Sequence, residues 1–117
     1  MGYYTHYEFY VKGAGTDTVT PEKEQEIITA LREQCEDANY ALREDGYAEQ
    51  ECKWYDSDED IRKFSKQYPG LILVLQGHGE ENGFHDPDIW IKYFKNGKMQ
   101  EAYAQVEFDD YDEAKLV

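Results

Sequence analysis

The side chains that could do chemistry are densest in one short stretch of the chain. Within eleven residues stand two histidines and four carboxylates, namely His78, Glu80, Glu81, His85, Asp86 and Asp88. Imidazole and carboxylate ligands together suit zinc or manganese. However, the two histidines are seven positions apart in a glycine-rich segment that no expected helix would hold in place. A metal-dependent enzyme using this loop is therefore only an alternative hypothesis, and we expect no metal and no cofactor.

Other patterns that would indicate catalysis are weak. The chain has no Gly-x-Ser-x-Gly segment, so Ser57 and Ser65 lie in no nucleophile motif. The segment Gly13-Ala-Gly-Thr16 lacks the remainder of any phosphate-binding loop. With 26 acidic residues, a pair of neighbouring carboxylates is expected by chance. We therefore expect a protein that is not an enzyme.

The charge of the chain restricts its partners. It has 12 Lys and Arg against 26 Asp and Glu, a formal net charge of −14 and a pI near 4.4. Such a chain repels phosphate backbones and anionic bilayers, so we expect neither direct nucleic-acid binding nor membrane binding. Fourteen charges correspond to about 24 Å of duplex DNA, the footprint of a small DNA-binding groove. The expected partners are basic, above all nucleic-acid-binding proteins. The alternative is that the acidity serves only solubility.

The chain also carries indications of its compartment. The longest apolar run, Leu71 to Leu75, is five residues long, far short of a membrane span. No apolar signal segment follows Met1. Cys35 and Cys52 are the only cysteines and share no metal spacing with a histidine, which favours two reduced thiols. We expect a cytoplasmic protein.

The periodicity of apolar residues along the chain predicts the helices and strands that must position these residues. Thr20-Pro21 is typical of a helix start, and Asn96-Gly97 of a type I′ hairpin turn. The expected elements are strands at 3–11, 51–55, 71–75, 88–95 and 98–108, helices at 20–44 and 57–68, a loop at 77–87 and an acidic tail at 109–117. This order, βαβαβββ, predicts a single α+β domain. We expect a two-layer sandwich, with two helices on a mixed sheet of about five strands.

The Asn-Gly turn also predicts the register of the hairpin. One face pairs Phe94 with Met99, Lys92 with Glu101 and Trp90 with Tyr103, and the other pairs Ile91 with Ala102 and Ile89 with Ala104. We expect the Ile and Ala face to lie under the helices, because small Ala residues allow close approach. The aromatic face carries an opposite-charge pair. It is either a surface that binds a partner or a face covered by the N-terminal segment of the same chain.

The second half of the chain resembles a known family. The segments that carry the likeness are Lys53-Trp54-Tyr55, Phe64 to Pro69, Gly77 to Gly83, and Asp88 to Lys98. Over roughly residues 50 to 100 they resemble the YubB ferredoxin-like domain family of phages and other mobile elements. The resemblance implies a ferredoxin-like fold and a mobile-element origin. It implies no activity and no catalytic residues.

Acidity and resemblance together give the leading hypothesis. The chain would be a small phage or mobile-element protein that inhibits a host defence nuclease or CRISPR effector by occupying its basic nucleic-acid groove. It would thus act as an anti-CRISPR or anti-restriction protein that mimics nucleic acid. The expected partner-binding residues are Trp90, Lys92, Phe94 and Tyr103 on the hairpin, with Asp58, Glu59, Asp60, Glu80 and Glu81 as acidic contacts. The alternative is a non-enzymatic accessory module of the element that binds another partner or forms a homodimer.

Overall fold

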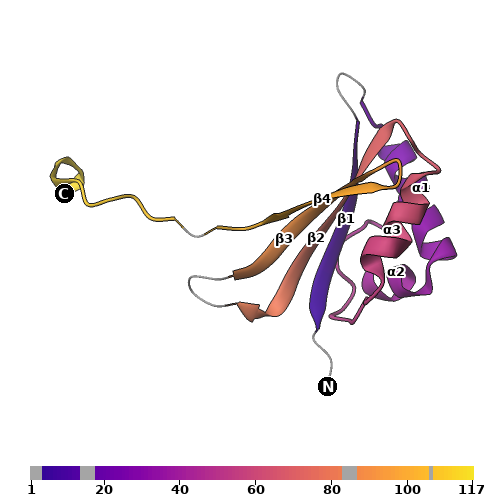
Figure 1. Cartoon of the computed structure of the whole chain (residues 1–117), viewed down its shortest axis with the longest axis horizontal. Helices are drawn as coiled ribbons and strands as arrows, with labels where there is room; N and C mark the ends of the chain where they lie inside the picture. The colour runs from indigo at the N-terminus through magenta and orange to yellow at the C-terminus, as the bar shows by residue number, and fades with distance from the viewer. Residues whose placement is uncertain (1–3, 14–17, 83–86, 106) are drawn as a thin grey trace.

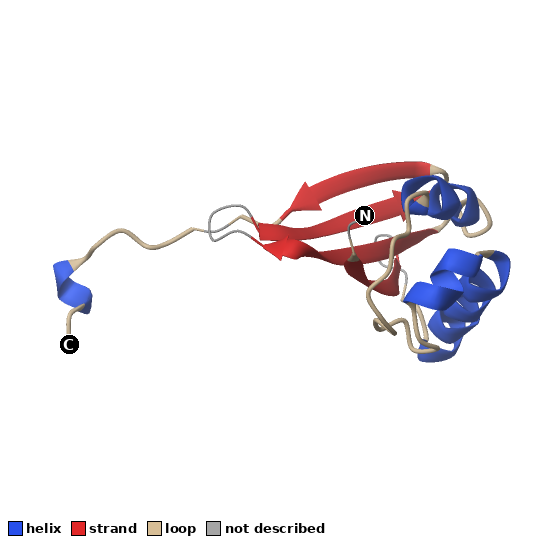
Figure 2. Ribbon diagram, turned by 90° about the horizontal axis from the view of Figure 1, so that it is seen from below, coloured by secondary structure: helices blue, strands red, loops and turns tan. Residues whose placement is uncertain are grey.

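The fold is an antiparallel sheet with helices on one side. The computed structural model describes residues 4–13, 18–82, 87–105 and 107–117. The four strands occupy the sheet in the order β1-β2-β3-β4, and each is antiparallel to its neighbour. Figures 1 and 2 show the helices gathered on one side of this sheet. The elements in chain order are β1 (Thr5–Gly13), α1 (Pro21–Gln34), α2 (Glu36–Ala41), α3 (Ser57–Ser65), β2 (Leu71–Asn82), β3 (Pro87–Lys95), β4 (Lys98–Tyr103) and a 3₁₀ turn (Glu113–Lys115).

The α+β class is confirmed, but the expected sheet of about five mixed strands is wrong. Residues 51–55 form no strand of the sheet and contribute a single bridge, from Cys52 to Thr5. The prediction failed because Cys52 and Trp54 are buried while Glu51 and Tyr55 are exposed, an alternation that imitates a strand. β2 also continues to Asn82, where a loop was expected from Gly77. As a result, all three helices come between β1 and β2 in the order of the chain, although these two strands are neighbours in the sheet.

The first helix begins where the sequence predicts and ends earlier. The Thr20 hydroxyl accepts a hydrogen bond from the backbone N–H of Lys23 at 3.1 Å, and Pro21 is the first helical residue. The helix ends at Gln34 instead of continuing to Glu44, because Cys35 adopts an extended backbone. α2 then begins in a new direction. The expected apolar stripe is nevertheless buried on both sides of the break, at Ile27, Ile28, Leu31, Ala38 and Leu42.

The hairpin has the predicted register and the opposite orientation. Every predicted pair is observed, and Asn96 and Gly97 have the positive φ angles that a type I′ turn requires, 47° and 82°. The aromatic face lies under the helices, since Trp90 is 9% and Phe94 0% exposed. Ile89 is instead 39% exposed on the other face. This corrects the expectation that the Ile and Ala face is the covered one.

Pairing with β2 explains this orientation. Phe94 lies opposite Leu73, and Trp90 lies opposite Gly77, where the absence of a side chain leaves room for the indole ring. The same face of β1 adds Tyr7 and Phe9, so the larger apolar side chains of all these strands meet on one side. Burying large aromatic side chains removes more apolar area from water than burying alanines.

The two edges of the sheet differ. Along β1, the outward backbone N–H groups of Thr5 and Phe9 donate to the carbonyls of Cys52 and Gly46 at 3.0 and 2.8 Å. The N–H of Val11 donates to a carboxylate oxygen of Glu24 at 3.0 Å. These three donors on the edge of β1 are therefore satisfied by other parts of the same chain, whereas β4 forms the opposite edge of the sheet.

Beyond β4 the chain leaves the domain. Residues 107–117, which we call the acidic arm, extend away from the sheet and end in the 3₁₀ turn (Figures 1 and 2). Within the described part of the chain, no helix combines the length and apolarity that crossing a membrane requires.

Candidate protein-docking site

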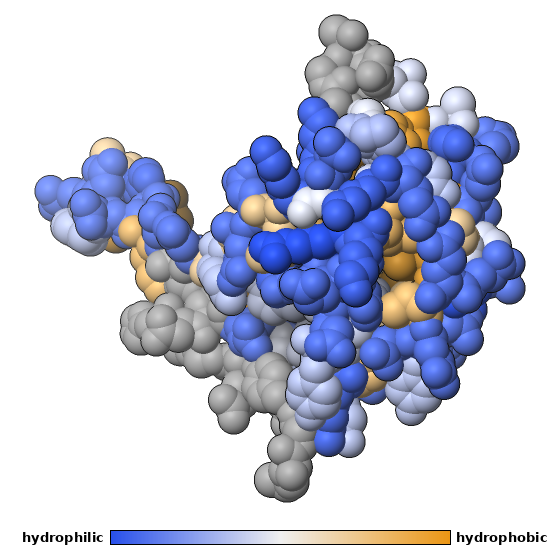
Figure 3. Space-filling view, turned by 45° about the vertical axis from the view of Figure 1, so that its right-hand side comes forward, coloured by the Kyte–Doolittle hydropathy of each residue, from blue (hydrophilic) through white to orange (hydrophobic). Residues whose placement is uncertain are grey.

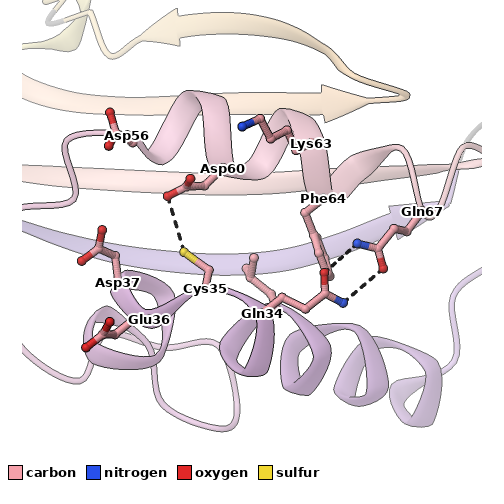
Figure 4. A pocket seen from close by; sticks show the side chains of 10 residues that line it. Gln34, Cys35, Glu36, Asp37, Asp56, Asp60, Lys63, Phe64 and Gln67 are labelled. Atoms are coloured by element: carbon pink, nitrogen blue, oxygen red, sulfur yellow. Dashed lines mark hydrogen bonds between the residues drawn. The ribbon is translucent and has the colours of Figure 1, made fainter.

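A hollow between the helices gathers acidic side chains. It has a volume of about 430 Å³ and lies where the junction of α1 and α2 faces α3 (Figure 4). We call it the acidic hollow. Its carboxylates are those of Glu36, Asp37, Asp56 and Asp60, and Lys63 is the cation among its lining residues.

Two helix N-termini bring these carboxylates together. Glu36 and Asp37 lie in the first turn of α2, while Asp56 precedes α3 and Asp60 lies in its first turn. The positive end of a helix dipole stabilises each carboxylate locally. However, the two helix starts face each other, so the carboxylates also repel one another. Burial raises the pKa of Asp37, and the charges of Asp60, Glu36 and Asp56 raise it further.

Asp60 lines the acidic hollow and forms hydrogen bonds with residues behind it. One of its carboxylate oxygens accepts a hydrogen bond from the indole N–H of Trp54 at 2.8 Å, and the Cys35 thiol donates to the same oxygen at 3.5 Å (Figure 4). Burial, with the nearby charge of Asp60 among the further causes, raises the pKa of Cys35 to about 11. The thiol is therefore protonated at neutral pH, and a protonated thiol is a poor nucleophile.

An amide pair closes the other end of the hollow. The side chains of Gln34 in α1 and Gln67 after α3 exchange two hydrogen bonds, at 3.1 and 2.7 Å (Figure 4). The contact joins the two helices across the hollow. The acidic hollow is thus a surface whose walls are fixed and whose polar groups are mainly acceptors, an arrangement that suits cationic donors.

The predicted acidic contacts have partners within the fold. Asp58 forms an ion pair with Lys92 at 2.8 Å, and Lys92 lies 4.5 Å from the centre of the Trp90 ring. Glu59 forms a longer pair with Arg62, at 3.9 Å. The structure therefore brings Asp58 and Lys92 together.

The predicted aromatic anchors divide between core and surface. Trp90 and Phe94 lie in the core, so they are not exposed to a partner, which corrects their expected role. Tyr103 remains 57% exposed. A hydrogen bond to Glu101 is the main cause that raises the pKa of Tyr103 to about 12, so the phenol is neutral at physiological pH.

The histidine-carboxylate stretch is described only in part. His78 is exposed on the face of the sheet away from the helices. His85 and Asp86 lie outside the described residues, as do the side chains of Glu80 and Glu81. Among the side chains that the structure does describe, no group of three or more His, Cys, Asp or Glu has an arrangement that would hold a metal ion.

Half of the net negative charge of the chain lies in the segment that contains the helices. Residues 18–70, which contain the helices, carry fourteen acidic and seven basic residues. The four strands carry five acidic and four basic residues and are nearly balanced. Figure 3 shows a largely hydrophilic surface with small apolar areas between. The helical layer therefore carries more net negative charge than the sheet does.

Sequence reasoning missed part of this site. Glu36 was not singled out, because a continuous helix through Cys35 would not place it at a helix start facing α3. Asp37 and Asp56 are likewise absent from the predicted acidic contacts, of which only Asp60 lines the hollow. The signal that could have indicated the hollow is the pair of acidic clusters at 36–37 and 56–60, each followed by a short amphipathic segment.

Comparison with known proteins adds no relative. No family model matches the chain, and searches of curated proteins and of solved structures found no similar protein.

Proposed function

We propose that this chain is a non-enzymatic binding protein that docks its acidic helical layer onto the basic surface of another protein. The observation that carries the proposal is the acidic hollow, where four carboxylates from two helix starts surround one space. Burial and then the charges of the neighbouring carboxylates raise the pKa of Asp37, and a cationic partner would offset the repulsive part of this cost on binding. Lysine or arginine side chains of a partner would donate to these oxygens.

Exposed tyrosines flank the acidic residues and supply anchors. Tyr40 in α2 and Tyr55, next to Asp56, are 57% and 77% exposed. Tyrosine is enriched at the energetically important centres of interfaces because it buries a large area and keeps a polar end. In this proposal Tyr40 and Tyr55 take the role that the sequence assigned to Trp90 and Phe94. Charge steers the encounter and the tyrosines hold the complex.

The partner class follows from the charge. A groove that accepts a polynucleotide is lined by Lys and Arg residues that neutralise phosphates, so its charge complements that of the helical layer. We therefore propose a host nuclease or CRISPR effector as the partner, and inhibition by nucleic-acid mimicry as the result. A phage or mobile-element origin, a ferredoxin-like relationship and a cytoplasmic location belong to the same proposal. They rest on the sequence resemblance, the single helical layer on an antiparallel sheet, and the reduced cysteines.

The test compares two variants with the same change in charge. In the hollow variant, Glu36→Gln, Asp37→Asn and Asp56→Asn remove three exposed carboxylates and leave Asp60 in place for Trp54. In the control variant, Glu44→Gln, Glu49→Gln and Glu51→Gln remove three exposed carboxylates that do not line the hollow. Each immobilised protein captures partners from a bacterial host lysate.

We expect the parent and the control variant to capture basic nucleic-acid-binding proteins, which duplex DNA or about 0.5 M NaCl releases. The hollow variant should lose most of this capture. Equal capture by both variants would remove the acidic hollow from the proposal. Capture of only neutral or acidic proteins by the parent would overturn the proposed function.

A further inference from the structure

The face of the sheet away from the helices is a second surface with a different character. We call it the open face. Its residues alternate with those of the core, and the pairing aligns them in rows across all four strands. One row consists of Lys12, Ile72, Lys95 and Lys98. The next contains Val74, which is fully buried between its cross-strand neighbours Tyr10 and Tyr93 although it lies outside the main core.

The row places three lysines on one face of the sheet in an acidic protein, with Ile72 between Lys12 and Lys95. We call Lys12, Lys95 and Lys98 the lysine row. All three side chains are exposed, and none of the ion pairs found among the described residues includes them. Lys95 and Lys98 lie directly opposite each other, a pairing of like charges that destabilises a sheet. Sheet stability therefore does not account for the lysine row, whereas binding an anionic group does.

An open hollow adjoins the lysine row. It has a volume of about 510 Å³ and is lined by the three lysines together with Ile72, Tyr93, Met99 and Gln100. The ligand that fits this hollow carries several negative charges and also apolar or aromatic groups. A bare phosphate or a metal ion does not have that combination, but a peptide does.

The acidic arm has this chemistry. Residues 107–117 contain five acidic residues and one lysine, the latter paired with Asp109 at 3.3 Å. Phe108 and Tyr111 stand among the acids and are 69% and 75% exposed. The charge and the aromatic content of the arm thus complement the lysine row and its hollow.

The arm of the same chain does not lie on this row. The lysine row is at the hairpin-turn end of the sheet, and the arm leaves from the other end, six residues or about 20 Å along β4. The residues that join β4 to the arm, 104–106, include no Gly, Pro, Asn, Asp or Ser to form a tight reversal. Figures 1 and 2 both show the arm directed away from the domain.

We propose that two copies of this chain associate by exchanging arms, with the acidic arm of each copy lying on the lysine row of the other. A two-fold arrangement makes the exchange reciprocal, so each dimer contains two such contacts. The second contact forms within the complex and adds to the first. This surface is opposite the acidic hollow, so the inference goes beyond the proposed function and does not depend on it.

Sedimentation velocity of the full chain at low salt tests the proposal. The parent should sediment as a dimer at about 100 µM, a concentration that detects micromolar association. Two variants should each be monomeric: the row variant with Lys12→Gln, Lys95→Gln and Lys98→Gln, and the arm variant with Asp109→Asn, Asp110→Asn, Asp112→Asn and Glu113→Gln. A control with Lys23→Gln, Arg43→Gln and Lys53→Gln, which line neither hollow, should remain dimeric. Circular dichroism checks that every variant is folded.

Mixing distinguishes arm exchange from other interfaces. The row variant keeps its arm and the arm variant keeps its lysine row, so an equimolar mixture can form one contact and should show a weaker heterodimer. A monomeric parent, or a row variant that remains a dimer, would overturn the proposal. So would a dimer that persists when residues 107–117 are deleted, since the interface would then lie elsewhere. None of these outcomes bears on capture by the acidic hollow.

Discussion

At the scale of single residues, Asp37 carries a charge that its surroundings oppose. Burial and three neighbouring carboxylates raise its pKa above the ordinary value of 3.8. A raised pKa means that the folded state binds the proton more readily than the unfolded state. Ionised Asp37 therefore destabilises the fold at neutral pH. This destabilisation fades as the pH falls through the folded-state pKa towards 3.8.

Replacing Asp37 by asparagine should consequently stabilise the protein at pH 7. Because Asp37 is largely exposed, the gain should be below about 1 kcal/mol, as for other exposed charge interactions. It should shrink on acidification and vanish below both pKa values. Urea unfolding at pH 7 and below pH 3.8 measures the change, and Asp110→Asn in the acidic arm is a control that should have no effect. A gain that is the same at both pH values would show that charge is not its cause.

The roles of individual residues could be predicted where local chemistry decides them. Thr20 caps α1 and Asn96-Gly97 forms the turn, because each depends only on residues nearby in sequence. The roles of Trp90 and Phe94 could not be predicted, since alternation shows which residues share a face but not which face the helices cover. That choice depends on pairing with β2, a contact between residues far apart in the chain.

At the scale of elements, the close approach of β2 and β3 depends on one glycine. A Cβ at Gly77 would overlap the indole ring of Trp90, which packs in turn against Tyr7 with ring centres 6.0 Å apart. This glycine lets a large aromatic side chain lie flat on the middle of the sheet. The aromatic face of the hairpin is therefore part of the core because a neighbouring strand makes room for it.

We expect Gly77→Ala to destabilise the protein by about 1–3 kcal/mol or more, the typical result of adding volume to a packed core. Gly70→Ala is the matched control, because a Cβ there meets no atom within 4 Å. Chemical denaturation followed by tryptophan fluorescence compares the two. Equal stabilities would contradict the packing of Trp90 against Gly77.

Elements were predicted least well where tertiary packing replaces regular structure. No proline or glycine marks the break at Cys35, yet bending the chain there brings Ala38 and Leu42 into the core. Likewise, Cys52 and Trp54 are buried without joining the sheet. Burial patterns are visible in the sequence, but hydrogen-bonding partners are not.

At the scale of the whole molecule, the imbalance of charge makes the fold sensitive to salt. Half of the net charge of −14 lies in the helical part of the chain, residues 18–70, where like charges repel. Salt screens this repulsion over distances beyond about 10 Å at 0.1 M. The folded state, which holds the charges closer together than the unfolded chain does, gains most from screening.

We therefore expect the Tm at pH 7 to rise with NaCl, at protein concentrations low enough to keep the chain monomeric. Near the pI of 4.4 the rise should become small, because the net charge approaches zero. Thermal unfolding followed by circular dichroism at both pH values makes the comparison. A Tm that is independent of salt at pH 7 would show that the carboxylates are individually neutralised by their neighbours.

The hydrogen bonds that cover the outer side of β1 have a consequence for crowded solutions. Carbonyls from Gly46 and Cys52 and the carboxylate of Glu24 already occupy three of the backbone donors that an incoming strand would need. Strand addition is thus favoured on the β4 side. When two molecules pair through their β4 edges, neither keeps a free β4 edge, so association through this edge stops at a dimer. Further growth of native sheets from the β1 side would have to displace these hydrogen bonds.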